Sequence, residues 1–332
     1  MRSIVNQDRF LGTLLGLAIG DALGMPFSGL SGDQIMACAG YVDRYHSRTL
    51  DDGVEVKPGE FTDESEIALC IVESLTTNQG ELDADNIGAR LLFLARGESR
   101  RWMSDDTLTT IDLAETTMDF RVPIDEDGPA TGDVAARGVP IGLLHSIGAF
   151  DPEPLRADAE LVTRLTHGSP AAIAGTTAVA FGVQLAAKGA PHAIAWARET
   201  AAFLGSGELA DRLLLATELA NSDVGANEAL SRIGLSAAMP DAVASAFYVA
   251  MTSNSFEDAI FMAVNAGGAT DTRGALVGAL KGTEVGANGI PQRLIDGLES
   301  RIYVSLAAPW FHKVALRRRG AVIDLRPTRE GE

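Results

Sequence analysis

Four glycines spaced four residues apart constrain the fold of this chain more than any other feature of its sequence. They lie within the apolar stretch 8–24 and are Gly12, Gly16, Gly20 and Gly24. On a helix this spacing leaves a strip without side chains along one side. Because glycine lowers helix propensity, its repeated use there indicates that another backbone comes very close. We therefore expect a central helix at 8–24.

Ten further stretches have apolar residues at spacings of three and four, the pattern of a helix with one buried side. They are 66–75, 84–95, 134–146, 154–165, 171–188, 192–204, 209–219, 240–251, 255–265 and 273–280. Alternation typical of strands is nearly absent, with 321–325 the best short candidate, and we expect loops at 51–53, 125–130 and 286–291. No linker or repeat marks a boundary. The sequence therefore predicts an all-α protein with one compact domain across residues 1–332.

The composition narrows the possible partners. Aromatic residues make up only 6% of the chain, which predicts a core of small and aliphatic side chains. The 27 Lys and Arg residues against 45 Asp and Glu give a net charge of −18. No long basic stripe offsets this charge, so nucleic-acid binding is not expected. We interpret the local exception, Arg317, Arg318 and Arg319, as a solvated helix end or tail.

Cysteine usage and the N-terminus give the remaining general expectations. Cys38 and Cys70 have apolar neighbours, so we interpret both as small core residues. The N-terminus lacks the pattern of a signal peptide, and the apolar stretch 10–23 is too short and too glycine-interrupted to span a bilayer. We expect a cytoplasmic protein with no membrane partner, and a monomer by default.

Two short acidic segments, far apart in the chain, each stand directly before a helix-like run. The first contains Thr62, Asp63 and Glu64. Hydroxyl and carboxylate oxygens are the hard ligands that Mg²⁺ or Mn²⁺ takes, and helix starts hold them at fixed angles. The alternative is a helix cap, with Thr62 or Asp63 at the N-cap and Glu66 completing a capping box.

The second segment contains Asp271 and Thr272, preceded by Gly267 and Gly268. The glycine pair allows a tight turn and a close approach of backbone to a ligand. The alternative is again a cap, since Thr270, Asp271 or Thr272 is suited to begin the following helix. If the two acidic segments meet in space, they make a metal site.

Two further features are weaker signals of a substrate site. His167 stands at the start of an apolar helix, where it is either a substrate contact or a structural hydrogen-bonding residue. The segment with Gly128, Thr131, Gly132 and Asp133 is either a loop around a phosphate or ribose or an ordinary turn. The other histidines show no pairing pattern, and we interpret them as structural; they are His46, His145, His192 and His312.

Taken in order along the chain, five motifs resemble those of the ADP-ribosylglycohydrolase family. They are Gly20-Asp21-Ala22-Leu23-Gly24-Met25-Pro26, Phe61-Thr62-Asp63-Glu64-Ser65 with Ala68-Leu69, 131–137 with Pro140-Ile141-Gly142, Thr166-His167, and Gly267-Gly268-Ala269-Thr270-Asp271-Thr272. The resemblance spans roughly residues 8–291 and is thin around 90–125 and 190–245. Five motifs in this order are far more specific than any one of them.

Members of that family are compact all-α proteins with a binuclear Mg²⁺ or Mn²⁺ centre at the base of a cleft. They hydrolyse the bond joining ADP-ribose to arginine, serine or a small leaving group. The resemblance implies an orthogonal helical bundle and catalytic roles for Asp63, Glu64 and Asp271. It also implies two larger sets: metal ligands at Thr62, Asp63, Glu64, Asp271 and Thr272, and substrate contacts at Gly128, Thr131, Gly132, Asp133, His167, Gly267 and Gly268.

Three residues depart from the family pattern at positions that carry chemistry. Ser28 stands where the family usually has a glutamate, Glu64 replaces a second aspartate, and Ala269 replaces the first aspartate of Asp-Thr-Asp-Thr. Losing one carboxylate leaves the repulsion between two dications less compensated, so we expect one bound ion and a second that is weak or absent. In addition, Gly132-Asp133 replaces Asn-Gly, and Asp133 would repel a phosphate.

These observations predict a metal-dependent glycosidase that cleaves an N- or O-ribosyl bond. Its substrate would be a small ribosyl or ADP-ribosyl compound, such as a nucleoside or nucleotide, or an ADP-ribosylated protein. The alternative is an inactive family member that binds ADP-ribose, a nucleotide or a partner protein.

Overall fold

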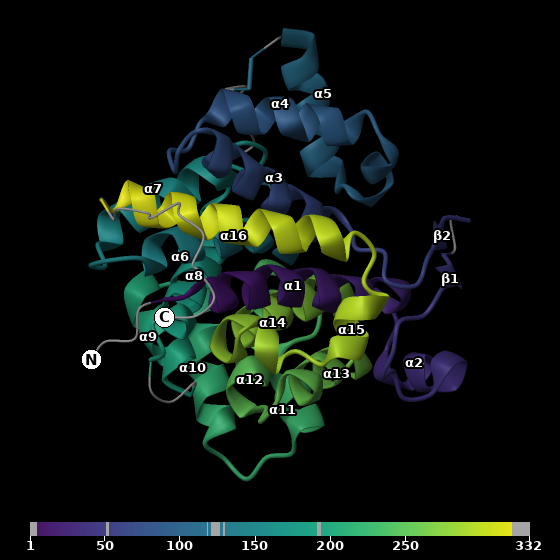
Figure 1. The fold of residues 1–332 in the computed structure, drawn as a ribbon. Helices are drawn as coiled ribbons and strands as arrows, with labels where there is room; N and C mark the ends of the chain where they lie inside the picture. Colours follow the sequence, from purple (N-terminus) through teal and green to yellow (C-terminus); the bar gives the residue numbers. More distant parts are fainter. Residues whose placement is uncertain are drawn as a thin grey trace, which may run out of the picture.

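The computed structural model describes the chain except for residues 1–4, 51–52, 118, 121–126, 129, 191–193 and 321–332. The described part is helical apart from two short strands, so the predicted all-α class is confirmed (Figure 1). The strands β1 (Arg48–Thr49) and β2 (Glu55–Val56) pair antiparallel, with Arg48 opposite Val56.

The helices are α1 (Gln7–Gly24), α2 (Gly32–Ala39), α3 (Asp63–Thr77), α4 (Ala84–Ala95), α5 (Asp105–Thr117), α6 (Gly138–Ser146), α7 (Pro152–Thr163), α8 (Pro170–Ala187), α9 (Ile194–Leu204), α10 (Glu208–Ala220), α11 (Ala226–Ile233), α12 (Met239–Thr252), α13 (Phe256–Asn265), α14 (Thr270–Val285), α15 (Gln292–Gly297) and α16 (Arg301–Arg318). Short 3-10 helices are η1 (Met25–Phe27), η2 (Glu98–Trp102), η3 (Gly132–Arg137) and η4 (Ala287–Gly289).

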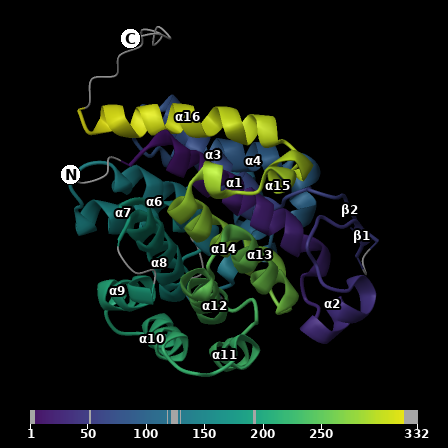
Figure 2. The same ribbon diagram turned by 60° about the horizontal axis from the view of Figure 1, so that its bottom comes forward.

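Helices α1 and α14 form an antiparallel pair at the centre of the molecule (Figures 1 and 2). The pair is held at backbone distance by glycines on both helices. A Cβ atom built on Gly16 would lie 2.1 Å from the carbonyl oxygen of Gly278, and one built on Gly20 would lie 1.9 Å from that of Gly274. The predicted close approach of a second backbone is therefore confirmed, and α14 carries a matching glycine strip.

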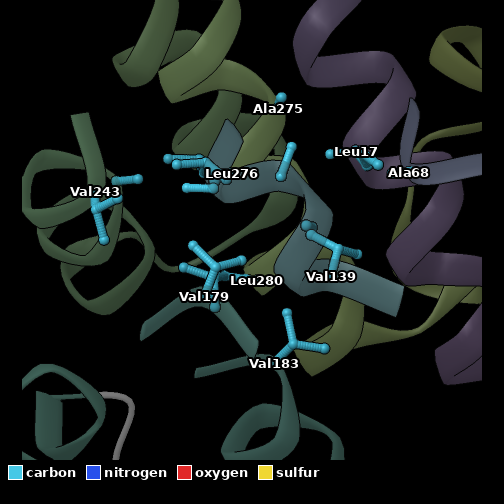
Figure 3. Packing of buried hydrophobic residues seen from close by; sticks show 14 of the residues in the cluster. Leu17, Ala68, Val139, Val179, Val183, Val243, Ala275, Leu276 and Leu280 are labelled. Carbon is cyan, nitrogen blue, oxygen red and sulfur yellow. The ribbon is translucent and has the colours of Figure 1, made fainter. Parts of the chain in front are cut away.

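Small and aliphatic residues fill the space around this pair, as the low aromatic content predicts. Figure 3 shows Val139 of α6, Val179 of α8 and Val243 of α12 converging on Leu276 and Leu280 of α14. All five side chains are fully buried. Helices α3 and α16 pack on the side of α1 away from α12 and α13, and α4 and α5 lie beyond α3 (Figure 1).

All ten further helices that the sequence predicts are present, and 84–95 matches α4 at both ends. The predicted helix 134–146 is divided between η3 and α6, and that at 192–204 is described from Ile194. Five helices were missed: α2, α5, α11, α15 and α16. On α16 the apolar Ile302, Leu306 and Trp310 are exposed, so its apolar residues do not mark one buried side. The predicted strand 321–325 lies outside the described residues.

Two expectations need correction. Cys38 is exposed, because α2 is short and buries only Ile35; Cys70 is buried as predicted. The expectation that the apolar stretch 10–23 is too short to span a bilayer is also corrected, because the helical segment around it is longer. Among the described residues, Gln7–Phe27 and Pro170–Ala187 are long and apolar enough to cross a membrane, but 89% and 72% of their tested windows are buried inside the protein. Arg317 and Arg318 lie in the last turn of α16, as a helix end.

Candidate functional site

The starts of α3 and α14 meet beside the end of α1, which brings the two acidic segments together. Glu64 accepts a hydrogen bond from Thr62 Oγ1 at its Oε2 (2.5 Å) and from Thr272 Oγ1 at its Oε1 (2.9 Å). One side chain therefore connects segments that are more than two hundred positions apart, 208 between Glu64 and Thr272. The convergence that the metal hypothesis requires is present.

The alternative of ordinary helix caps is confirmed for the position of Thr62 alone, and neither segment caps its helix through a side-chain hydrogen bond. Thr62 occupies the N-cap position of α3, but its side chain makes no capping hydrogen bond. Glu66 does not complete a capping box, and its Oε1 accepts from Ser99 Oγ (2.8 Å). The N-cap of α14 is Ala269, which has no capping group, and Thr270 Oγ1 donates to the carbonyl oxygen of Gly24 (2.8 Å). The polar groups are thus turned toward other helices.

Asp21 on α1 organises the start of α3, and our sequence analysis gave it no role. Its Oδ2 accepts from Thr62 N (3.0 Å), Ser65 N (3.2 Å) and Ser65 Oγ (2.6 Å), and its Oδ1 accepts from Thr62 Oγ1 (2.8 Å). A carboxylate from another helix therefore takes the place of the missing cap. The signal in the sequence is a lone acid inside an apolar, glycine-rich helix.

One proton in this network is shared. Thr62 Oγ1 lies within hydrogen-bonding distance of both Asp21 Oδ1 and Glu64 Oε2, yet a hydroxyl has only one proton to donate. A proton on Asp21 or Glu64 that is donated to Thr62 Oγ1 accounts for both short distances in the metal-free site. Burial and nearby carboxylates raise the pKa of Glu64 well above its ordinary value, and burial raises the pKa of Asp21 to about 7.

Asp63 accepts no hydrogen bond within the described part of the chain. The residue is 5% exposed, and its side chain faces the pocket. Burial raises its pKa well above the ordinary range, and Asp133, Asp21 and Asp271 raise it further, while Arg137 opposes them. A buried carboxylate without partners is costly unless a cation or donor compensates it.

These groups surround a pocket of about 220 Å³. Its lining includes most of the predicted site and is formed by Met25, Ser28, Thr62, Asp63, Glu64, Trp102, Ser104, Thr131, Gly132, Asp133, Ala237, Ala269, Asp271 and Thr272. Four of these residues were not predicted: Met25 lies in the first of the five motifs but was given no role, and Trp102, Ser104 and Ala237 come from segments without a chemical motif. Ala237 is placed by pairing with the 130–132 loop, since Gly132 N donates to its carbonyl oxygen (2.8 Å).

Unpartnered polar atoms also lie in the segment 131–133, which lines the pocket. Thr131 Oγ1 and Asp133 Oδ1 are buried and have no hydrogen-bond partner within the described chain. Ser28 Oγ donates to Asp271 Oδ1 (2.9 Å), and Asp271 also accepts from Thr272 N (2.8 Å). Because buried polar groups are normally paired, the open positions at Thr131 and Asp133 indicate a place for a ligand or water.

His167 is held as a neutral hydrogen-bond donor. Arg137 Nη1 donates to Thr166 Oγ1 (2.6 Å), so the Thr166 hydroxyl proton is directed to His167 Nδ1 (2.8 Å). The imidazole proton is then on Nε2, which is buried and unpartnered among the described residues. Burial, with Arg137 nearby, lowers the pKa of His167 to about 4. His167 does not line the pocket directly.

Three predicted substrate residues do not line the pocket either: Gly128, Gly267 and Gly268. The two glycines before α14 have positive φ and contact backbone, since a Cβ atom would lie 2.4 Å from Gly32 N at Gly267 and 1.9 Å from Leu235 O at Gly268. Packing accounts for both, and a substrate contact from them stays a prediction. His145 bonds Asp158 and His312 bonds the carbonyl of Val5, which suits structural roles, while His192 lies outside the described residues.

The donor set has the chemistry of a site for a hard divalent cation, but its side chains are not arranged around one. No group of three or more His, Cys, Asp or Glu side chains in the described ranges stands ready to hold a metal. Thr62, Thr272 and Ser28 hydroxyls occupy carboxylate oxygens of Glu64 and Asp271 instead. All the candidate ligands are oxygens, and Asp63 is unpartnered, so the residues fit Mg²⁺ or Mn²⁺ once these hydrogen bonds open.

Comparisons with known proteins agree with the fold. The sequence model of a family described as ADP-ribosylglycohydrolase matches residues 2–325. An uncharacterized protein of Archaeoglobus fulgidus is 31% identical over 94% of this chain and 98% of its own length. The ADP-ribosyl-[dinitrogen reductase] glycohydrolase of Rhodospirillum rubrum is 26% identical over 89% of this chain and 92% of its own. A solved ADP-ribosylglycohydrolase-related protein complex matches with a TM-score of 0.69, 26% identity and coverage of 93% and 98%.

Proposed function

The chain belongs to the ADP-ribosylglycohydrolase family, and from this premise we propose that it is a metal-dependent hydrolase of an N- or O-ribosyl glycosidic bond. The observation that carries the proposal is the convergence of Thr62, Asp63 and Glu64 with Asp271 and Thr272 on one pocket. The relative from Rhodospirillum rubrum supports an ADP-ribosyl linkage as the type of bond.

One Mg²⁺ or Mn²⁺ would be held by oxygens of Thr62, Asp63, Glu64, Asp271 and Thr272. When bound, the ion supplies positive charge for the ribose oxygens and lowers the pKa of a coordinated water. Ala269 lines the pocket where a further carboxylate would complete a second site, so a second ion is expected to bind weakly or not at all.

The protein's own groups would orient the reactants. Asp63 faces the pocket with a raised pKa and no hydrogen bond, which suits a carboxylate that accepts a proton from the attacking water. Ser28 cannot serve as a base at neutral pH, and its contact with Asp271 Oδ1 fixes the direction of that carboxylate. His167 does not line the pocket, so its Nε2 proton would reach the substrate through a bound water.

A second candidate function is binding without catalysis. Two observations favour it: Ala269 offers no ligand, and hydroxyl groups already occupy the oxygens of Glu64 and Asp271. A protein that binds ADP-ribose or a nucleotide does not need a metal-activated water, so it tolerates both features.

Calorimetric titration with Mg²⁺ and Mn²⁺ separates the two candidates. We expect binding of one ion to the wild-type chain and none to Asp63→Asn, while Asp223→Asn, a control at an exposed position, binds normally. Product release is then measured with ADP-ribosyl-arginine, ADP-ribosyl-serine and nucleosides. Absence of metal binding at millimolar concentrations rules out the hydrolase. Ala269→Asp combined with Ser28→Glu should raise activity on the ADP-ribosyl compounds.

A further inference from the structure

The pocket lining is unsuited to phosphate. Four carboxylates line it, at Asp63, Glu64, Asp133 and Asp271, and none of the described lining residues is Lys, Arg or His. The nearby Arg137 and Arg273 are buried and do not line the pocket. Arg137 donates to Thr166 Oγ1, and Arg273 donates to the carbonyl oxygens of Ala263 and Gly267. A single divalent ion would therefore be the only cationic group that a pyrophosphate meets among the described lining residues.

The volume of the pocket also favours a ligand smaller than ADP-ribose. About 220 Å³ is below the roughly 300 Å³ at which pockets for drug-sized ligands begin. A ribose with a small planar group fits a pocket of this size better than a complete ADP-ribose does.

Asp133 provides a recognition group for such a compound. Its Oδ1 is buried and unpartnered in the described part of the chain, and a carboxylate oxygen accepts hydrogen bonds. A ligand that places an N–H donor on Asp133 Oδ1 satisfies the open acceptor, whereas a phosphate oxygen does not.

Trp102, the last residue of η2, is the aromatic residue among the described residues that line the same pocket. The Arg101 guanidinium lies 4.5 Å from the centre of the indole ring and is itself paired with Glu60. This contact holds the ring in place by a cation–π interaction. An aromatic side chain and an unpaired carboxylate oxygen in one pocket are a combination that recognises planar groups carrying N–H donors.

We propose that the pocket takes phosphate-free N-ribosides whose planar aglycone donates hydrogen bonds, and that Asp133 and Trp102 set this preference. This inference rests on the proposed hydrolase function and names its substrate class. In the reaction, the C1–N bond of the riboside breaks and its electron pair goes to the aglycone nitrogen. Water gives a hydroxyl to C1, and its remaining proton ends on the aglycone, so the products are ribose and the free aglycone and no redox partner is needed.

The test is ligand binding by calorimetry on the full chain in Mg²⁺, with adenosine, ribosylguanidine, AMP and ADP-ribose. We expect adenosine or ribosylguanidine to bind at least about tenfold more tightly than AMP and ADP-ribose, and the better of the two identifies a neutral or a cationic aglycone. Asp133→Asn should reduce this preference at least about fivefold, and Trp102→Ala should weaken the preferred riboside about tenfold while Trp102→Phe retains most of its affinity. The exposed Trp310→Ala and Asp223→Asn are matched controls.

Tighter binding of ADP-ribose than of both phosphate-free ribosides overturns the inference, as does failure of both ribosides to bind at 10 mM or an unchanged preference in a folded Asp133→Asn variant. Turnover is measured separately by release of ribose. Selective binding without ribose release removes the proposed hydrolase function and leaves the ligand preference, whereas turnover of ADP-ribosyl compounds without the preference removes only the inference.

Discussion

The α1–α14 contact and the pocket at its end use opposite kinds of packing. Along the contact, the space beside Gly12, Gly16 and Gly20 is filled by carbonyl oxygens of α14. In the pocket, Asp63 is buried without a hydrogen bond, among carboxylates that repel it. The difference shows how the fold tolerates its site. The close backbone contact places α1 against α14, and Asp21 of α1 binds the start of α3, so the starts of α3 and α14 stay together although their acidic side chains repel each other.

Replacing Gly16 with alanine should break the contact between α1 and α14 and cause the largest loss of stability among the changes proposed. The new Cβ atom would lie 2.1 Å from Gly278 O, so α1 and α14 must separate. We expect the free energy of unfolding to fall by at least ~3 kcal/mol, although the same change in an open helix stabilises by up to ~1 kcal/mol. Urea denaturation followed by circular dichroism measures it.

The matched control is Gly225→Ala, because nothing lies near that Cβ position and φ is −65°. We expect a change within ~0.5 kcal/mol there. A Gly16→Ala variant as stable as the wild type would show that the glycine contact does not hold the helices together.

Reducing the charge in the pocket should raise the stability of the metal-free protein, whereas filling the glycine contact lowers it. Asp63→Asn removes a repelled charge and loses no hydrogen bond, so we expect the metal-free variant to be more stable than the wild type. The wild type should gain ~2.7 kcal/mol from metal at a hundred times its Kd, and Asp63→Asn should gain none. Thermal unfolding with EDTA and with Mn²⁺ tests both expectations. Destabilisation of the metal-free variant would contradict the repulsion argument.

The free energy of unfolding should also depend on pH through the carboxyl groups of the pocket, with a smaller effect than the substitutions above. The pKa values of Asp63, Glu64 and Asp271 are raised in the folded state, so the fold keeps protons that the unfolded chain releases above about pH 4. Their contribution to stability is therefore present at low pH and lost as the pH rises through the folded pKa values, at up to ~1.4 kcal/mol per pH unit and group. The difference between wild type and Asp63→Asn in EDTA isolates this contribution.

The same groups should release protons when metal binds, because ligands must be ionised. Calorimetry at pH 6 in two buffers with different ionisation enthalpies would detect this release. Equal enthalpies in the two buffers would show that Glu64 and Asp63 are already ionised.

The sequence predicts the elements of this protein better than their contacts. Apolar periodicity predicts both ends of α4. The two acidic segments each begin a long helix, as predicted, and the starts of these helices line one pocket. The capping box failed because Asp21 binds Thr62 and Ser65 from positions 41 and 44 residues away, which no local pattern records. Trp102 lies in a 3-10 segment without periodicity. The glycine strip of α14 was visible at 274, 278 and 282, but we ended that helix at 280.

The repeat of four on both central helices leaves their alignment ambiguous. After a slip of one helical turn, Gly16 would meet Gly282 and Gly20 would meet Gly278, so backbone contact alone does not select the native arrangement. Two threonine contacts distinguish it: Thr13 Oγ1 with Thr283 Oγ1 (2.7 Å) and Thr270 Oγ1 with Gly24 O (2.8 Å). A slip of one turn would break both contacts and move the start of α14, with Asp271 and Thr272, away from Gly24 and from the start of α3.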